Sequence, residues 1–128
     1  MILNFKPQFK GLILNGTKIH SIRIDQHRKW KPGMVIHYST GARTKLYNQF
    51  WYGHCKSIQE INIFRRYDQG DQIFLGVYID HRKFSDLELQ EFIKNDGLDD
   101  LFEFANWFTP EPKWIFSGRL IHWTSKRY

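Results

Sequence analysis

The chain has 128 residues, of which 17% are aromatic, and 19 basic against 13 acidic residues give it a formal net charge of +6. This length is typical of one domain, so we interpret residues 1–128 as a single domain. No apolar run approaches the ~18 residues of a membrane helix and the start lacks the apolar core of a secretory signal, so we expect no membrane partner. Cys55 is the single cysteine, which excludes an internal disulfide and agrees with a cytoplasmic location.

The basic residues are concentrated in the first half of the chain. Residues 1–66 hold twelve Lys or Arg residues against Asp25 and Glu60, whereas residues 67–128 hold seven against eleven acidic residues. This asymmetry indicates that the cations gather on one basic, concave surface that binds a polyanion, with acidic helices elsewhere. The alternative is that the cations are scattered and serve solubility, because halves of a sequence need not be faces of a fold.

The first predicted element is a short strand over residues 1–5. A helix follows, which Pro7 can begin and Gly16 can end. Two further strands are predicted over residues 18–24, where β-branched residues recur, and over residues 34–39, which follow a Lys-Pro-Gly turn.

Residues 40–53 show no clean periodic pattern, so we interpret them as a long loop. Loops of that length are uncommon in compact domains and are often functional. This one combines basic and aromatic residues, among them Arg43, Lys45, Tyr47 and Trp51. Recognition of single-stranded RNA uses cations for the backbone and ring faces for the bases, and we therefore interpret the loop as a nucleic-acid contact.

Two strands are predicted next, over residues 54–64 and 72–80, with a polar turn over residues 65–72 between them. The stretch Ser85-Asp86-Leu87-Glu88 fits a capping box and predicts a helix over residues 86–94. A second helix and a closing strand complete the chain, at residues 98–108 and 113–125. These five to six strands, with one N-terminal helix and a helical pair before the last strand, predict an α+β fold built on a small β-barrel or a strongly bent sheet.

One stretch, ILNGTKIHSIR at residues 13–23, resembles the signature of the ASCH domains, which are relatives of the PUA superfamily. The Lys-Pro-Gly turn, NDGL at residues 95–98 and FSGRLIHWT at residues 116–124 also fit that family. The resemblance implies a PUA-like barrel of five to six strands with a cleft beside the first helix-to-strand junction. It also implies RNA or a nucleotide as the partner, although some related small proteins are amidohydrolases that act on N4-acetylcytidine.

Lys18, Ser21 and Arg23 are the candidate binding residues at this junction. Ser21 and Arg23 share one face of a strand because side chains alternate, and the long Lys18 side chain can reach Ser21. Two cations beside a small hydroxyl suit a phosphate or a carbonyl oxygen. We therefore interpret the chain as an RNA- or nucleotide-binding domain whose basic cleft holds these three residues under the loop of residues 40–53.

An enzymatic alternative stays open. The resemblance implies Ser21 as the nucleophile and Lys18 as the general base, which is chemically sound because a serine needs a neighbour that takes its proton. The amidohydrolase relatives typically have threonine at the position of Ser21 and a glutamate at the position of Arg82. Asp80 is the nearest acid that can replace that glutamate.

No pattern predicts a cofactor or a metal. The six histidines lack the spacing of metal-ligand motifs, and no Gly-rich nucleotide loop or Gly-x-Ser-x-Gly elbow is present. We interpret His122 as a buried histidine of the last strand. A third hypothesis is a protein-interaction module that uses exposed aromatic residues such as Trp51 and Trp107, whose binding would be insensitive to salt.

Overall fold

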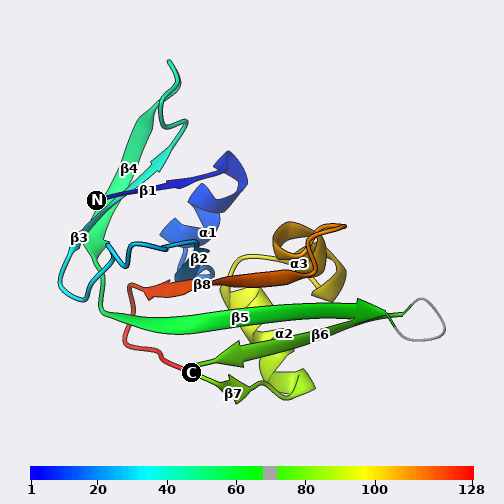
Figure 1. The fold of residues 1–128 in the computed structure, drawn as a ribbon. Coiled ribbons are helices and arrows are strands. Elements are labelled where there is room, and N and C mark those ends of the chain that lie inside the picture. The colour runs from blue at the N-terminus through cyan, green and yellow to red at the C-terminus, as the bar shows by residue number, and fades with distance from the viewer. Residues whose placement is uncertain (68–71) are drawn as a thin grey trace.

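The computed structural model describes residues 1–67 and 72–128, and their fold is α+β with two sheets (Figure 1). The described elements are β1 (Ile2–Phe5), η1 (Pro7–Phe9), α1 (Lys10–Leu14), β2 (His20–Arg23), β3 (Val35–Thr40), β4 (Asn48–His54), β5 (Ser57–Tyr67), β6 (Ile73–Ile79), β7 (Arg82–Lys83), α2 (Asp86–Asn95), α3 (Leu101–Phe108) and β8 (Ile115–His122). One sheet has the order β1-β3-β4 and the other the order β2-β8-β5-β6-β7. The predicted N-terminal helix and the helical pair before the last strand are confirmed.

The five-stranded sheet buries one face under α2 and α3 (Figure 1). In β5, Ile61 and Ile63 are fully buried while Phe64 is 43% exposed, which is the alternation of a strand with one covered face. The helix α2 is capped by Ser85, whose hydroxyl accepts a hydrogen bond from Glu88 N and whose N–H donates to the Glu88 carboxylate. The predicted capping box is therefore confirmed.

The three-stranded sheet meets the larger one through buried aromatic rings. Tyr38 of β3 is fully buried, and its ring lies 6.2 Å from that of Phe5 in β1 and 5.1 Å from that of Trp123, just after β8. Because these rings come from both sheets, they join the two sheets without a hydrogen-bonded ladder. The expectation of a closed barrel with five to six strands is not met within the described residues, which form eight strands in two separate sheets.

The prediction of a loop over residues 40–53 is wrong in its second half, because β4 pairs there with β3. Its aromatic residues Phe50, Trp51 and Tyr52 favour a strand. A register irregularity lies between Tyr38 and Ser39 of β3, and such irregularities obscure a period-two pattern. The resulting hairpin projects from the body of the molecule, with its turn at the tip (Figure 1).

The prediction of a polar turn over residues 65–72 is wrong for its first three residues. Residues 65–67 extend β5, since they pair in register with β6, and residues 68–71 lie outside the described part of the chain. Within the described residues, no helix is long and apolar enough to cross a membrane.

Candidate ligand-binding cleft

A cleft of about 250 Å³ lies where α1 gives way to β2. Gly16 ends α1 with a φ of +84°, a conformation that glycine adopts at little cost, and the chain then turns so that Lys18 N donates to Leu12 O at 2.9 Å. The cleft is lined by three cations, one carboxylate and several aromatic rings, namely Lys6, Lys18, Arg23, Asp96, Phe5, Phe9 and Trp107. Cationic and aromatic groups therefore share one cavity.

Lys18 is held inside the cleft by Asp96 at the end of α2. Its Nζ atom is buried and donates to the Asp96 main-chain oxygen at 2.6 Å and to Asp96 Oδ1 at 3.1 Å. Burial lowers the pKa of Lys18, although the Asp96 carboxylate opposes this effect. Burial alone would raise the pKa of Asp96, but Lys18 and the bond from His20 hold it below its usual value. The two groups therefore form a buried ion pair.

His20 and Tyr128 extend this network away from the cleft. His20 Nδ1 lies 3.2 Å from Asp96 Oδ1, and His20 Nε2 lies 2.8 Å from the Tyr128 hydroxyl oxygen. Asn95 Nδ2 also donates to that oxygen at 3.0 Å. Burial lowers the pKa of His20 and raises the pKa of Tyr128 to about 12. A neutral His20 then donates from Nδ1 to Asp96 and accepts from Tyr128, which fixes the ring.

The sequence did not identify Asp96 as part of the site. It lies 78 positions from Lys18, and in the sequence the NDGL stretch serves only as part of the family resemblance. The following Gly97 has a φ of +90°, and a Cβ atom there would lie 3.2 Å from both Lys18 Cδ and Phe9 Cδ1. Glycine is therefore needed at this position both for the turn and for the close approach of Lys18.

Ser21 and Arg23 lie on the same face of β2, as predicted. Arg23 Nε donates to Ser21 Oγ at 2.8 Å, and Arg23 Nη2 donates to the main-chain oxygen of Asn4 at 2.7 Å. Ser21 Oγ therefore accepts one bond and keeps its own hydrogen for a ligand. Within the described residues, the hydrogen bonds of Lys18 Nζ go to Asp96 and none goes to Ser21.

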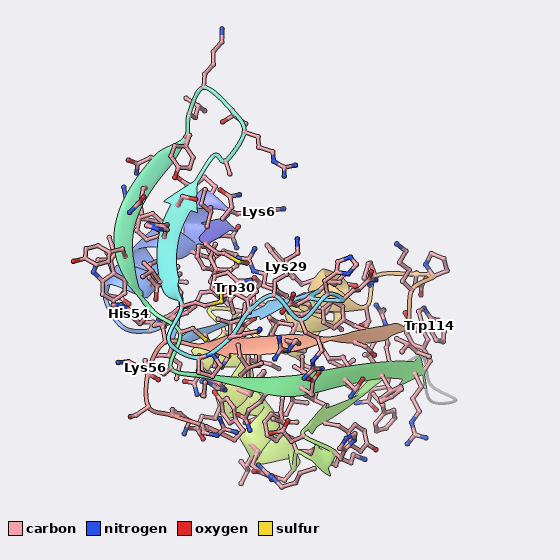
Figure 2. All side chains as sticks on the ribbon, turned by 60° about the vertical axis from the view of Figure 1, so that its left-hand side comes forward. Lys6, Lys29, Trp30, His54, Lys56 and Trp114 are labelled. Atoms are coloured by element: carbon pink, nitrogen blue, oxygen red, sulfur yellow. The ribbon has the colours of Figure 1, made fainter. Side chains whose placement is uncertain are left out.

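The four predicted residues of the hairpin do not line the cleft; they are Arg43, Lys45, Tyr47 and Trp51. The first three belong to the turn between β3 and β4, whereas Trp51 in β4 is 45% exposed and stacks on Tyr38 at 5.0 Å. The base of this turn nevertheless meets the rim of the cleft, because Ala42 N donates to Asn4 Oδ1 at 2.9 Å. The hairpin is thus attached beside the cleft, and its tip points away from the body (Figure 2).

The expectation that the cations of the first half gather in one cavity is wrong for most of them. Of those cations, Lys6, Lys18 and Arg23 line the cleft. Arg28 pairs instead with Glu60 at 2.9 Å, and Lys56 lies far from Lys6 (Figure 2). The cations of the first half of the chain are close in sequence but lie apart in the fold, because the strands of this half belong to two different sheets.

Asp80 is not brought to the cleft either. It follows β6, where its carboxylate accepts from Gln59 Nε2 at 3.0 Å and from Glu60 N at 2.9 Å. The carboxylate at the cleft is that of Asp96. His122 is fully buried, as predicted; its Nε2 lies 2.9 Å from Gln59 Oε1, and burial lowers its pKa to about 3.

Within residues 1–67 and 72–128, no group of three or more His, Cys, Asp or Glu side chains is placed to hold a metal ion. The cleft residues instead offer N–H and O–H donors, charge and ring faces, which suit an anionic ligand with an aromatic part. No protein-family model, curated protein or solved structure matches this chain.

Proposed function

We propose that the protein is an RNA- or nucleotide-binding domain of the ASCH type, in which the cleft holds one nucleotide and the β3–β4 hairpin contacts the adjoining backbone. The observation that carries the proposal is the meeting of cations and aromatic rings in one cavity. Three cations and a single carboxylate line it, so the cavity keeps a positive charge when Lys18 and Asp96 are both ionised. A nucleotide presents the complementary pair, a phosphate and a flat base.

The positions of the rings and cations suggest which part of the cleft holds the base and which part holds the phosphate. Lys6 Nζ lies 4.9 Å from the Trp107 ring centre, and Arg23 Cζ lies 4.9 Å from that of Phe5. Trp107 is 38% exposed and offers a face for a base, while Arg23 and Ser21 offer donors for phosphate oxygens. Since sites for drug-sized ligands measure ~300–1,000 Å³, a cleft of about 250 Å³ suits one nucleotide of a strand better than several.

The proposal of an ASCH-type domain also includes the arrangement of the two sheets. We interpret the two sheets as the two parts of an opened PUA-like barrel, which are held together by side chains. Arg23 of β2 donates to Asn4 O of β1, and the Phe5 ring meets Trp123 at 6.1 Å. In this arrangement the cleft lies at the seam between the sheets, so that a ligand there touches both.

Arg23→Gln tests the cleft directly. Titration with a nucleoside 5′-monophosphate and with a short oligouridylate should show affinity reduced by at least ~10-fold, because a bidentate cation is replaced by a neutral amide. Arg82→Gln is the matched control, since Arg82 is exposed and pairs with Glu88 outside the cleft. Equal affinities for the two variants, with unchanged circular dichroism spectra, would remove the cleft from the binding site. Binding of wild type that does not change with salt would favour the protein-interaction hypothesis instead.

A second candidate, an amidohydrolase acting on an acylated nucleoside, is favoured by one observation. Lys18 and Ser21 line the same cleft, and burial lowers the pKa of Lys18 toward the neutral form that a base requires. In this reaction neutral Lys18 takes the Ser21 proton, Ser21 Oγ attacks the acyl carbon, the amine leaves with a proton, and water then releases the acid. The bonds of Lys18 to Asp96 oppose it, because they stabilise the ammonium form.

Release of acetate from N4-acetylcytidine tests this second candidate. Ser21→Ala should abolish release while the free energy of unfolding changes little. Absence of turnover by the wild-type protein on acylated nucleosides would leave nucleotide binding as the function.

A further inference from the structure

Among residues 1–67 and 72–128, backbone pairing covers the outer edge of β6 at its end. The two-residue strand β7 pairs with the last two residues of β6, and Phe84 N donates to Val77 O at 2.9 Å. The N–H and C=O groups of alternate residues point to the same side of a strand. Those of Ile73 and Leu75 therefore point outward, as Val77 O does, and within the described residues no backbone group pairs with them on that side.

Two adjoining cavities, of about 300 and 310 Å³, follow this edge between β6 and α2. Leu75 and Leu89 line both cavities, and Ile93 lines the first. The apolar side chains come from the covered face of β6 and from the amphipathic face of α2. An open strand edge beside an apolar helix face is the setting in which an extended peptide adds to a sheet.

Among the described residues, two of the three cations that line the second cavity face the other side of the sheet; the third, Arg65, is buried on the covered face, where it donates to Thr109 O. Arg66 and Lys83 line the second cavity, and they lie opposite Phe74 and Tyr78 on the exposed face. Asp86 is the acidic residue that lines the two cavities within the described chain. A strand added at this edge would therefore place alternate side chains against apolar groups and the intervening side chains near cations.

We propose that the β6 edge and α2 bind an extended peptide segment of another protein by strand addition. The segment alternates apolar residues, which pack on the exposed parts of Ile73, Leu75 and Leu101, with acidic residues, which pair with Arg66 and Lys83. The backbone groups of Ile73 and Leu75 supply the hydrogen bonds. This site is separate from the nucleotide cleft and shares no lining residue with it.

The test uses a dye-labelled peptide, acetyl-Leu-Glu-Leu-Glu-Leu-amide, and the complete protein. Binding should slow hydrogen exchange of the Ile73 and Leu75 amides by at least ~10-fold, since these unprotected groups become hydrogen-bonded. N-methylation of one alternate set of peptide amides should lower the affinity by at least ~10-fold, and methylation of the other set should not, because only one set faces the strand. Equal effects of both methylations, or no effect of the peptide on exchange, would overturn the proposal.

A charge-reversed pair of variants checks the acidic specificity. Arg66→Glu combined with Lys83→Glu should weaken peptide binding by at least ~10-fold. Lys29→Glu combined with Lys56→Glu gives the same change in net charge away from the groove and should leave the affinity unchanged. Similar losses in both double variants would overturn the proposed acidic specificity. Slower hydrogen exchange of the Ile73 and Leu75 amides on raising the protein concentration alone would assign the edge to a second copy of the chain. Slower exchange on adding an oligouridylate would assign it to nucleic acid. Either result would overturn the proposal that the edge binds a peptide.

Discussion

The cleft and the β3–β4 hairpin are both basic, but their cations are held in different ways. In the cleft, Lys18 and Arg23 are fixed by hydrogen bonds to Asp96, Ser21 and Asn4. The basic residues of the hairpin turn are exposed. Fixed, partly desolvated cations bind an anion in one geometry, whereas exposed cations attract a polyanion over a distance that salt screens. The difference predicts that the cleft determines what is bound and the hairpin how strongly salt affects binding.

The largest effect is expected for Asp96→Ala. This variant leaves the buried Lys18 ammonium without its carboxylate and His20 without its Nδ1 partner. Loss of one partner of a buried ion pair costs ~3–5 kcal/mol of unfolding free energy, to be measured by urea denaturation. Glu91→Ala removes an exposed pair with Lys126 at 3.5 Å and should change stability little. Equal stabilities of the two variants would show that the buried ion pair of the cleft stabilises the protein no more than an exposed ion pair does.

Acid should lower the free energy of unfolding through the buried His122. The pKa of His122 is lowered to about 3 in the folded protein, below its unfolded value of ~6.5. The unfolded chain therefore binds this proton first, so the contribution of His122 to stability is complete above pH ~6.5 and falls by at most ~1.4 kcal/mol per pH unit as the pH drops toward 3. His20, whose pKa burial also lowers, adds to this loss. Urea midpoints between pH 7 and 4 should show this loss, and His122→Phe should make the dependence of stability on pH less steep while leaving the contribution of His20. An unchanged slope in the variant would contradict the assignment.

A pair of glycine substitutions tests how closely the cleft is packed. Gly97→Ala places a Cβ atom against Lys18 and Phe9 at a φ of +90° and should cost ~1–3 kcal/mol of unfolding free energy. Gly11→Ala is the control within α1, where a Cβ atom meets nothing within 4 Å, and it should stabilise the protein by up to ~1 kcal/mol. Both values follow from denaturant unfolding, and equal signs would contradict the close approach of Lys18.

The smallest effect on the folded protein is expected in the hairpin. Arg43→Ala combined with Lys45→Ala should leave stability unchanged, because both residues are exposed in the turn. If both contact phosphates of a single strand, the slope of log affinity against log salt should fall by ~1.4. Binding of an oligouridylate at several salt concentrations measures this slope. An unchanged slope would remove the hairpin from the RNA contact.

The sequence predicted those elements whose signals are local. The capping box at Ser85 and Glu88 defined the start of α2 to the residue. The strand β4 was missed because Phe50 is an extra residue in its pairing with β3, and such an insertion interrupts the period-two pattern. The number of sheets was missed because pairing is a property of distant segments.

The same limit applied to the site. Alternation along β2 correctly placed Ser21 and Arg23 on one face, because both lie in one strand. Asp96 reaches Lys18 only through the packing of α2 against the junction, and no periodicity connects them. The count of charges along the chain overestimated the number of cations in the cleft for the same reason. Residues such as Arg28 lie elsewhere in the fold and form a separate ion pair.

Asn4 carries a consequence for how the two basic regions communicate. Its carbonyl accepts from Arg23 and its side chain accepts from Ala42, so a single residue spans the boundary between them. If a ligand in the cleft shifts Arg23, Asn4 connects that shift to the first residues of the hairpin turn, and reciprocity then requires that a strand bound at the turn changes affinity in the cleft by the same coupling free energy. Asn4→Ala would keep the carbonyl and delete the amide, so it separates the contact with Arg23 from the contact with Ala42.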